Sequence, residues 1–460
     1  MYHAESWSDK TKLLLKILWP ILVTQLGLYA MNLTDTIMSG WVSKQDLAGV
    51  AIGSSLWMPI ITGINGILLA VTPIVSQMVG SGKQSGIARF ISQALYVSFM
   101  VAMAVVIAGF FLFKPVIGLM GLEDKVAHIA YYYLVALLFG IVPLFASNVL
   151  RYFFDAQGFT RISMFITLLA VPFNILLNYV FIFGKFGVPA YGGIGSGYAT
   201  AITYWLILLI SIVMTFKMPA VRSYRLFIEW AAPSLKAWKE LFTIGIPIGL
   251  SIFFEVSIFS VVTLLMGMLF DTGTIASHQI ALSFSSLVFM VPLSISMALT
   301  IVVGYSVGSG KMKAARQYSL LGVGGGIGLM GLAAFVLFFL REPIAYLYTQ
   351  DSEVAVLAAQ FLIFAIFYQI SDAAQASLLG VLRGYKDVQM PFLIAFVSYW
   401  IVGLPSGYLL SAYTSMGAYG FWAGIIIGLT FAAAGFMLRL MRIQKNIRLG
   451  AAPAVVEAGA

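Results

Sequence analysis

Most of this sequence consists of apolar runs that are long enough to cross a lipid bilayer. A helix needs about 20 residues to cross the hydrocarbon core, and soluble domains average about 25% charged residues. This sequence is 61% hydrophobic and only 9% charged. We therefore predict an all-α polytopic membrane protein with twelve transmembrane helices, at residues 13–38, 47–78, 90–113, 127–149, 162–184, 194–216, 241–269, 275–306, 317–340, 354–380, 388–411 and 417–438.

The basic residues predict how these spans are oriented. An even number of spans puts both termini on one side, and all but five of the 26 Lys and Arg residues fall on that side. Cytoplasmic loops carry an excess of Lys and Arg, so we expect both termini in the cytoplasm and the protein in the plasma (inner) membrane. The net charge of +9 then reflects topology. We expect the lipid bilayer as a partner and no nucleic acid.

Short motifs recur in the same order in the two halves of the sequence. Three pairs match, with offsets of 228, 226 and 225 residues: 79–83 (VGSGK) with 307–311, 157–164 with 383–390, and 192–195 with 417–420. The Gly-Ser-Gly-Lys copies lack the flanking residues of a phosphate loop, so we interpret them as tight turns.

This repetition predicts two lobes of six helices each. Six spans give both halves the same orientation, and parallel repeats are related by a pseudo-two-fold axis along the membrane normal. We predict an N-lobe at 1–225, a cytoplasmic linker at 226–240 and a C-lobe at 241–460 that ends in a short cytoplasmic tail. We expect the protein to be a monomer.

Three carboxylates, Asp35, Glu255 and Asp372, lie well inside apolar runs. A charged residue at the bilayer centre costs roughly 2.5–3.5 kcal/mol on insertion scales and is functional by default. The alternative, an acid that bonds a neighbouring helix for assembly alone, is weak for three acids. The only basic residue expected inside a span is Lys16, at the cytoplasmic edge. The net negative interior predicts H⁺, Na⁺ or organic cations as ligands.

Depth along the helices divides these acids between two sites. At 1.5 Å per residue, Glu255 lies about 21 Å from the cytoplasmic start of its helix and Asp372 about 16 Å from the cytoplasmic end of its own. We therefore expect the two acids to share one site. Asp35 lies about 33 Å into the first helix, in the outer half of the N-lobe. There Asn174 and Asn178 point two amides to one side of the fifth span, either into a site or into a helix–helix hydrogen bond.

Four residues are candidates for the wall of a substrate cavity. Gln25 and Asn32 belong to a polar stripe on the first helix, and such a stripe must face protein or water. Phe253 and Phe289 offer aromatic faces for cation–π contacts. Core packing is the alternative explanation for each aromatic residue.

Together these residues resemble the multidrug and toxic compound extrusion (MATE) family, in its NorM-like branch, over nearly the whole chain. The resemblance depends on the run Asp35–Gly40 (DTIMSG), on Pro247 with Glu255, and on Asp372 followed by Leu382–Asp387 (LRGYKD). The repeated Gly-Ser-Gly-Lys turns also fit.

The resemblance implies a secondary active antiporter, not an enzyme. It implies export of organic, often cationic, compounds and drugs in exchange for Na⁺ or H⁺ by alternating access, without a covalent cofactor. It also implies that Glu255 and Asp372, with Tyr368 nearby, bind the coupling cation, and ionised oxygens in number suit Na⁺. The implied protonatable network of the N-lobe comprises Asp35, Asn174, Asn178, Asp155 and Thr200.

Three other classes of protein remain as alternatives. A twelve-span porter of the major facilitator type usually has an Asp-Arg-rich loop between spans two and three, which 80–89 lacks. A flippase for lipid-linked oligosaccharides usually has a cationic cavity, and we expect no basic residue in this interior. An intramembrane enzyme lacks support, because no His/Glu metal spacing or paired catalytic Asp motif occurs.

Overall fold

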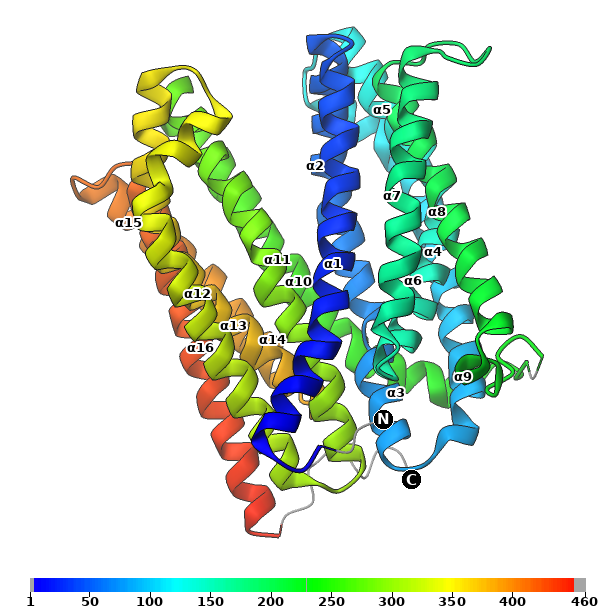
Figure 1. The fold of residues 1–460 in the computed structure, drawn as a ribbon. Helices are drawn as coiled ribbons and strands as arrows, with labels where there is room; N and C mark the ends of the chain where they lie inside the picture. The colour runs from blue at the N-terminus through cyan, green and yellow to red at the C-terminus, as the bar shows by residue number, and fades with distance from the viewer. Residues whose placement is uncertain (1–3, 229, 451–460) are drawn as a thin grey trace. The chain divides into compact units, whose positions relative to one another are not determined.

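The structure is a computed structural model that describes residues 4–228 and 230–450 (Figure 1). Throughout these residues the regular structure is helical. The chain divides into two compact units. We call Trp19–Gly249 the N-unit, and Met1–Leu18 together with Leu250–Ala460 the C-unit. The lobe bounds 1–225, 226–240 and 241–460, and the two-fold relation between the lobes, stay predictions.

The helices follow one another along the chain with short connections. They are α1 (Trp7–Gly40), α2 (Lys44–Leu68), α3 (Val71–Gly80), η1 (Gln84–Gly86), α4 (Ile87–Leu119), α5 (Asp124–Leu138), α6 (Ile141–Ala156), α7 (Thr160–Phe183), α8 (Gly193–Lys217), α9 (Pro219–Arg222), α10 (Leu235–Leu269), α11 (Thr272–Gly308), α12 (Met312–Tyr348), α13 (Ser352–Gly384), α14 (Gln389–Phe396), η2 (Val397–Gly403), α15 (Leu404–Tyr413) and α16 (Tyr419–Arg448).

The predicted all-α architecture with twelve transmembrane helices is confirmed. In the described part of the chain, 11 helical segments are long and apolar enough to cross a membrane. The pair α5 and α6, bent by 51° at its break, supplies the twelfth span. In the described residues, interrupted candidate spans include this bent pair, α2 with α3, which are separated at Leu69 and Ala70, and α14 with α15, which are separated by η2.

A proline accounts for the bend between α5 and α6. Pro143 has no backbone N–H to donate to the carbonyl of Phe139, four residues earlier. The indole Nε1 of Trp205 in α8 donates to that carbonyl instead, at 3.0 Å. Pro73 lies four residues after Leu69 in the same way, at the break between α2 and α3. The bend between α5 and α6 therefore lies where a proline releases a carbonyl, whereas the carbonyl of Leu69 accepts the backbone N–H of Thr72 at 3.0 Å.

The recurring Gly-Ser-Gly-Lys motifs form the same turn. Gly82 has φ +74° and Gly310 has φ +73°, in the left-handed region that favours glycine. The backbone N–H of Lys83 donates to the carbonyl of Met78 at 3.0 Å, and that of Lys311 to its counterpart Ser306 at 2.9 Å. Both copies are tight turns, as the sequence predicts.

The second predicted match between the halves is wrong by two residues. Gly158, after α6, donates its backbone N–H to the carbonyl of Asp155 at 2.9 Å, and Lys386, after α13, donates to Arg383 at 2.8 Å. Gly158 has φ +79° and Lys386 has φ +57°. The equivalent turns are thus offset by 228 residues, not 226. The sequence comparison matched Gly158 with Gly384, because Lys386, and not a glycine, has the left-handed conformation in the second turn.

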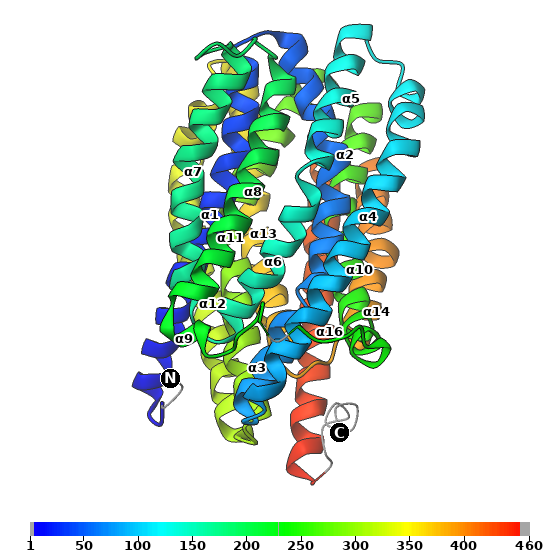
Figure 2. The same ribbon diagram turned by 90° about the vertical axis from the view of Figure 1, so that its right-hand side faces the viewer.

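Each unit is built around closely packed helices. In the N-unit, α5 packs against α2 and α8, and α8 also packs against α7 (Figure 2). In the C-unit, α13 packs against α11, α12 and α16 (Figure 1). Every residue of α13 from Gln375 to Gly384 is buried. The last turns of α13 therefore lie inside protein.

Asp46 joins the start of α2 to the start of α8 by a hydrogen bond. Its Oδ1 accepts the backbone N–H of Gly193 at 2.6 Å, and its carboxylate also bonds the hydroxyl of Ser43. Gly192, with φ +58° and ψ −136°, takes a conformation that essentially only glycine adopts. Only 6% of Asp46 is exposed. Its backbone partner explains this burial.

Replacing Asp46 with alanine should destabilise the N-unit. The variant leaves the N–H of Gly193 without its charged acceptor, and hydrogen bonds to charged groups contribute about 1.5–3 kcal/mol. We expect the thermal unfolding midpoint of the purified protein to fall by about 2–4 °C or more, and the exposed Asp124→Ala to serve as the control. An Asp46→Ala variant that melts with the control would contradict this role.

Candidate functional site

Asp35 in α1 is buried among hydrogen-bond donors that carry no charge. Its Oδ1 accepts the side-chain N–H of Asn178 at 2.7 Å, and its Oδ2 accepts the hydroxyl of Thr200 at 2.6 Å. Only 3% of the residue is exposed. Among the described residues, no Lys or Arg pairs with this carboxylate. Its charge is therefore stabilised only by neutral dipoles.

Helices α7 and α8 extend this network. The amide of Asn178 also donates to Asn174 Oδ1 at 3.2 Å. Asn174 in turn donates toward the hydroxyls of Thr200 and Thr203, at 3.4 and 3.3 Å. The i, i+4 spacing puts both amides on one face of α7. The structure thus brings together four of the five residues of the predicted N-lobe network.

The fifth residue, Asp155, lies in a different set of contacts. Because α6 extends to Ala156, Asp155 is inside a helix, and 3% of it is exposed. Its Oδ1 accepts the hydroxyl of Ser163 at 2.7 Å, and Arg151 lies one turn earlier as an opposite charge. The hydrogen bonds of the described residues do not join it to Asp35.

A small cavity is lined by residues that lie near each of these two groups of contacts. Its volume is about 40 Å³, and its walls include Arg151 and Ser163 near Asp155 and Tyr204, which interacts electrostatically with Asp35. A water needs roughly 10–15 Å³ of such volume and two to four polar partners. The cavity is large enough for a water molecule, but neither Asp35 nor Asp155 is among the residues that line it.

Glu255 in α10 and Asp372 in α13 are joined by a single amide. Gln375 Nε2 donates to Glu255 Oε1 and to Asp372 Oδ1, at 3.0 Å each. Two N–H bonds on one nitrogen are what a glutamine amide can offer. Asp372 is 2% exposed. The structure therefore brings the two acids together, as the depths along their helices predict.

Two tyrosines complete this carboxylate pair. The hydroxyl of Tyr399 donates to Gln375 Oε1 at 3.0 Å, and Tyr368 hydrogen-bonds Asp372. Tyr399 belongs to η2, a π-helical segment that precedes Pro405, and such segments are frequent at functional sites. The hydroxyl and carboxylate oxygens of this cluster are the hard ligands that an alkali cation prefers.

Arg383 corrects the expectation of an interior without basic residues. The sequence places it at the cytoplasmic end of its span, but only 4% of the residue is exposed. Because α11, α12 and α16 cover α13 to its end, the arginine is enclosed by protein. It lies near enough to Glu255 to attract it electrostatically. By contrast, Asp155 occupies the equivalent position in the N-unit.

The predicted substrate-cavity residues differ in burial. Gln25 is buried, Asn32 and Phe289 are half-buried, and Phe253 is 36% exposed. None of the four is among the residues that line the two cavities described for residues 4–228 and 230–450. Their role in substrate binding stays a prediction.

Four residues of these clusters were not assigned to a site from the sequence. Spacing does put Gln375 on the same helical face as Asp372, without giving it a role, and Thr203 lies one turn beyond Thr200, so spacing could have found it. Tyr399 is one of several aromatic residues that could face a cavity, but spacing could not assign it to Gln375, because a π-helical turn changes which residues face the neighbouring helix. Arg383 was missed because burial at the end of a span depends on neighbouring helices.

Comparison with known proteins places the chain in a family. The MatE family model matches residues 20–180 and 247–409. The protein called probable multidrug resistance protein NorM in Halalkalibacterium halodurans is 51% identical over 452 residues, 98% of each chain. The protein of the same name in Bacillus subtilis is 49% identical over 446 residues, 97% of this chain and 98% of the relative.

Solved structures agree at the level of the fold. A crystal structure of the eukaryotic MATE transporter AtDTX14 matches with a TM-score of 0.87 at 21% identity, covering 96% of this chain and 98% of the other. The Vibrio cholerae MATE transporter VcmN, in its bent form, matches with a TM-score of 0.83 at 21% identity, covering 96% and 99%. From the family model and its near full-length relatives, we conclude that this chain belongs to the MATE family.

Proposed function

We propose that this protein is a secondary active transporter that exports organic, often cationic, drugs in exchange for Na⁺ or H⁺ by alternating access. The observation that carries the proposal is the buried carboxylate of Asp35, which is bonded only by uncharged donors among the described residues. A mobile cation is then the natural counter-charge. Membership of the MATE family, with relatives called multidrug resistance proteins, supports export as the direction of transport.

In this proposal Asp35 is the proton switch of the N-lobe. A carboxylate that is protonated loses its charge and can donate a hydrogen bond. Asn178 and Asn174 each carry an amide oxygen that can accept such a bond after a side-chain rotation, so protonation would rearrange the network of α7 and α8. Asp155 would join through Ser163, which donates to it and lines the small cavity together with Tyr204.

The pair Glu255 and Asp372 is the proposed Na⁺ site of the C-lobe. Two carboxylates bonded to one amide place several oxygens close together, and the hydroxyls of Tyr368 and Tyr399 add neutral ligands. Arg383 attracts Glu255 from one side and balances part of the negative charge. A monovalent cation would neutralise more of it.

Exchange follows from competition for these charges. An organic cation and the coupling ion both neutralise a buried carboxylate, and a ligand shifts a conformational equilibrium only by its differential affinity for the two states. Loading H⁺ or Na⁺ from outside would weaken drug binding and favour the inward-facing state. Drug binding from inside would favour the reverse change.

The expected absence of basic residues in the interior no longer argues against a flippase for lipid-linked oligosaccharides, because Arg383 is a buried cation. The family match now carries the distinction. Arg383 lies beside Glu255, so its charge is already partly balanced, whereas a pyrophosphate ligand needs uncompensated cations.

Neutralising the buried acids should abolish most efflux. We expect Asp35→Asn, Glu255→Gln and Asp372→Asn each to lower the initial rate of ethidium efflux from energised cells by about tenfold or more, since a hydrogen bond to a charged group contributes about 1.5–3 kcal/mol. The rates are normalised to the amount of protein in the membrane. The exposed acids Glu123→Gln and Glu353→Gln should keep the unmodified rate. Unmodified efflux in all three buried variants would refute the proposal.

The two carboxylate centres should respond to different ions. In proteoliposomes energised by a Na⁺ gradient alone, Glu255→Gln should lose uptake of an organic cation while Asp35→Asn retains a measurable rate. Under a pH gradient alone the order should reverse. The reason is that Na⁺ needs several ionised oxygens, whereas a single acid suffices for a proton. Equal losses under both gradients for both variants would contradict this division.

A further inference from the structure

The segment after α8 contains the start of the predicted linker at 226–240. It is attached by hydrogen bonds to α4 within the N-unit. Gln93 in α4 donates to the carbonyl of Ala232 at 2.7 Å and accepts the backbone N–H of Ser234 at 2.8 Å. Tyr96, one turn later, donates to the carbonyl of Ala231 at 3.2 Å. Three hydrogen bonds to the backbone define the path of this segment.

A row of aromatic rings strengthens the attachment. Tyr96 also accepts a hydrogen bond from Trp230 Nε1, and the two rings meet edge to face at 5.5 Å. Trp230 stacks on Phe227 at 6.1 Å, and Phe227 contacts Phe216 of α8 at 5.9 Å. Trp230 is 46% exposed and Phe216 45%. Partly exposed aromatic rings at the end of a span are typical of the membrane interface.

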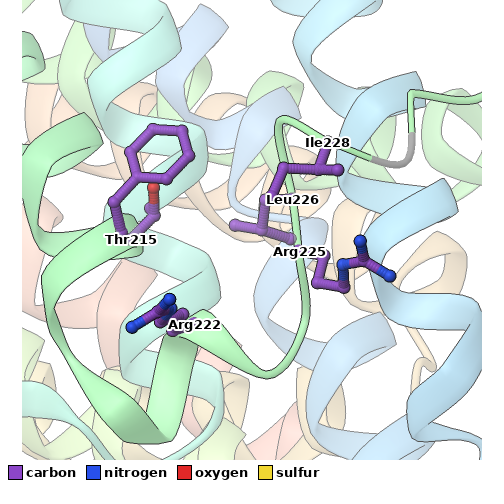
Figure 3. Close-up of a pocket in the computed structure, with 6 residues that line it drawn as sticks. Thr215, Arg222, Arg225, Leu226 and Ile228 are labelled. Atoms are coloured by element: carbon purple, nitrogen blue, oxygen red, sulfur yellow. The ribbon is translucent and has the colours of Figure 1, made fainter.

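This attachment shapes a cavity of about 330 Å³ at the end of α8, within the range of small-ligand pockets. Figure 3 shows Arg222 and Arg225 on opposite sides of Leu226. The cavity is lined by Thr215, Phe216, Arg222, Arg225, Leu226 and Ile228. It therefore combines two guanidinium groups with apolar side chains.

The backbone at Arg225 departs from the usual conformation. Its φ is +52°, a region that costs a non-glycine residue about 1–3 kcal/mol. A glycine would take this conformation without strain, so an arginine here suggests a role for its side chain.

We propose that this pocket binds the phosphate of an anionic phospholipid from the leaflet that the charge distribution predicts to be cytoplasmic. Arginine binds phosphate in a bidentate manner, and basic residues immediately cytoplasmic of a transmembrane helix attract anionic head groups. A soluble phosphate would use only the arginines. Phe216 and Ile228, the latter 59% exposed, give an acyl chain an apolar surface beside the head group. Charge and apolar exposure together therefore favour a lipid.

The test is retention of a defined lipid by the full-length protein. The purified transporter is exchanged into detergent with phosphatidylglycerol or phosphatidylcholine, and bound lipids are counted by native mass spectrometry. We expect a preference for phosphatidylglycerol, weakened about fivefold for each arginine removed, the factor for one basic residue near an anionic surface. The variant is Arg222→Gln with Arg225→Gly, which keeps the positive φ accessible. Lys236→Gln with Lys239→Gln is the control with equal charge loss outside the pocket.

Three results would overturn the proposal. The first is equal retention of both lipids, and the second is an equal loss in the pocket and control variants. The third is a rise in the thermal midpoint with glycerol 3-phosphate alone that matches the rise with phosphatidylglycerol, which would indicate a site for soluble anions. Replacing Ile228 with serine should weaken lipid retention and leave any response to glycerol 3-phosphate unchanged. Lipid retention is measured independently of drug efflux, so the lipid proposal can fail while the proposed function stands.

Discussion

The structure depends on hydrogen bonds that stabilise buried carboxylates. A buried charge must be paired or hydrogen-bonded, because leaving it bare costs many kcal/mol. The N-unit surrounds Asp35 with the amide of Asn178 and the hydroxyl of Thr200. The C-unit joins Glu255 and Asp372 through the amide of Gln375. Neutral donors leave room for a dissociable cation, whereas a fixed salt bridge would fill that place permanently.

Interruptions in the helices allow hydrogen bonds that support these carboxylates. The break at Phe139 lets the carbonyl released by Pro143 bond with Trp205 of α8, and the π-helical segment η2 carries Tyr399, which bonds Gln375. Buried polar residues on α7, α8 and α13 thus lie on helices fixed by contacts with their neighbours. Rigid supports of this kind keep hydrogen-bond partners within reach of each carboxylate.

Much of this could be predicted from the sequence, because a bilayer leaves strong traces in it. The length of the apolar runs predicted twelve spans. Three of these runs each contain an isolated acid, and these acids are Asp35, Glu255 and Asp372. Spacing also grouped Asn174 with Asn178. Local patterns did not reveal the burial of Arg383 and Asp46, since both depend on which helices lie alongside. The register of the turn at Lys386 was hidden because a lysine holds the left-handed conformation in place of glycine.

The central claim is that organic cations and coupling ions compete for the same buried carboxylates. The most direct measurement is the affinity of the purified protein for a fluorescent organic cation, titrated at several Na⁺ concentrations and then at several pH values. Competition predicts that the apparent dissociation constant rises as Na⁺ is added and as pH is lowered, because both neutralise the acids. An affinity that is independent of both Na⁺ and pH would contradict the account.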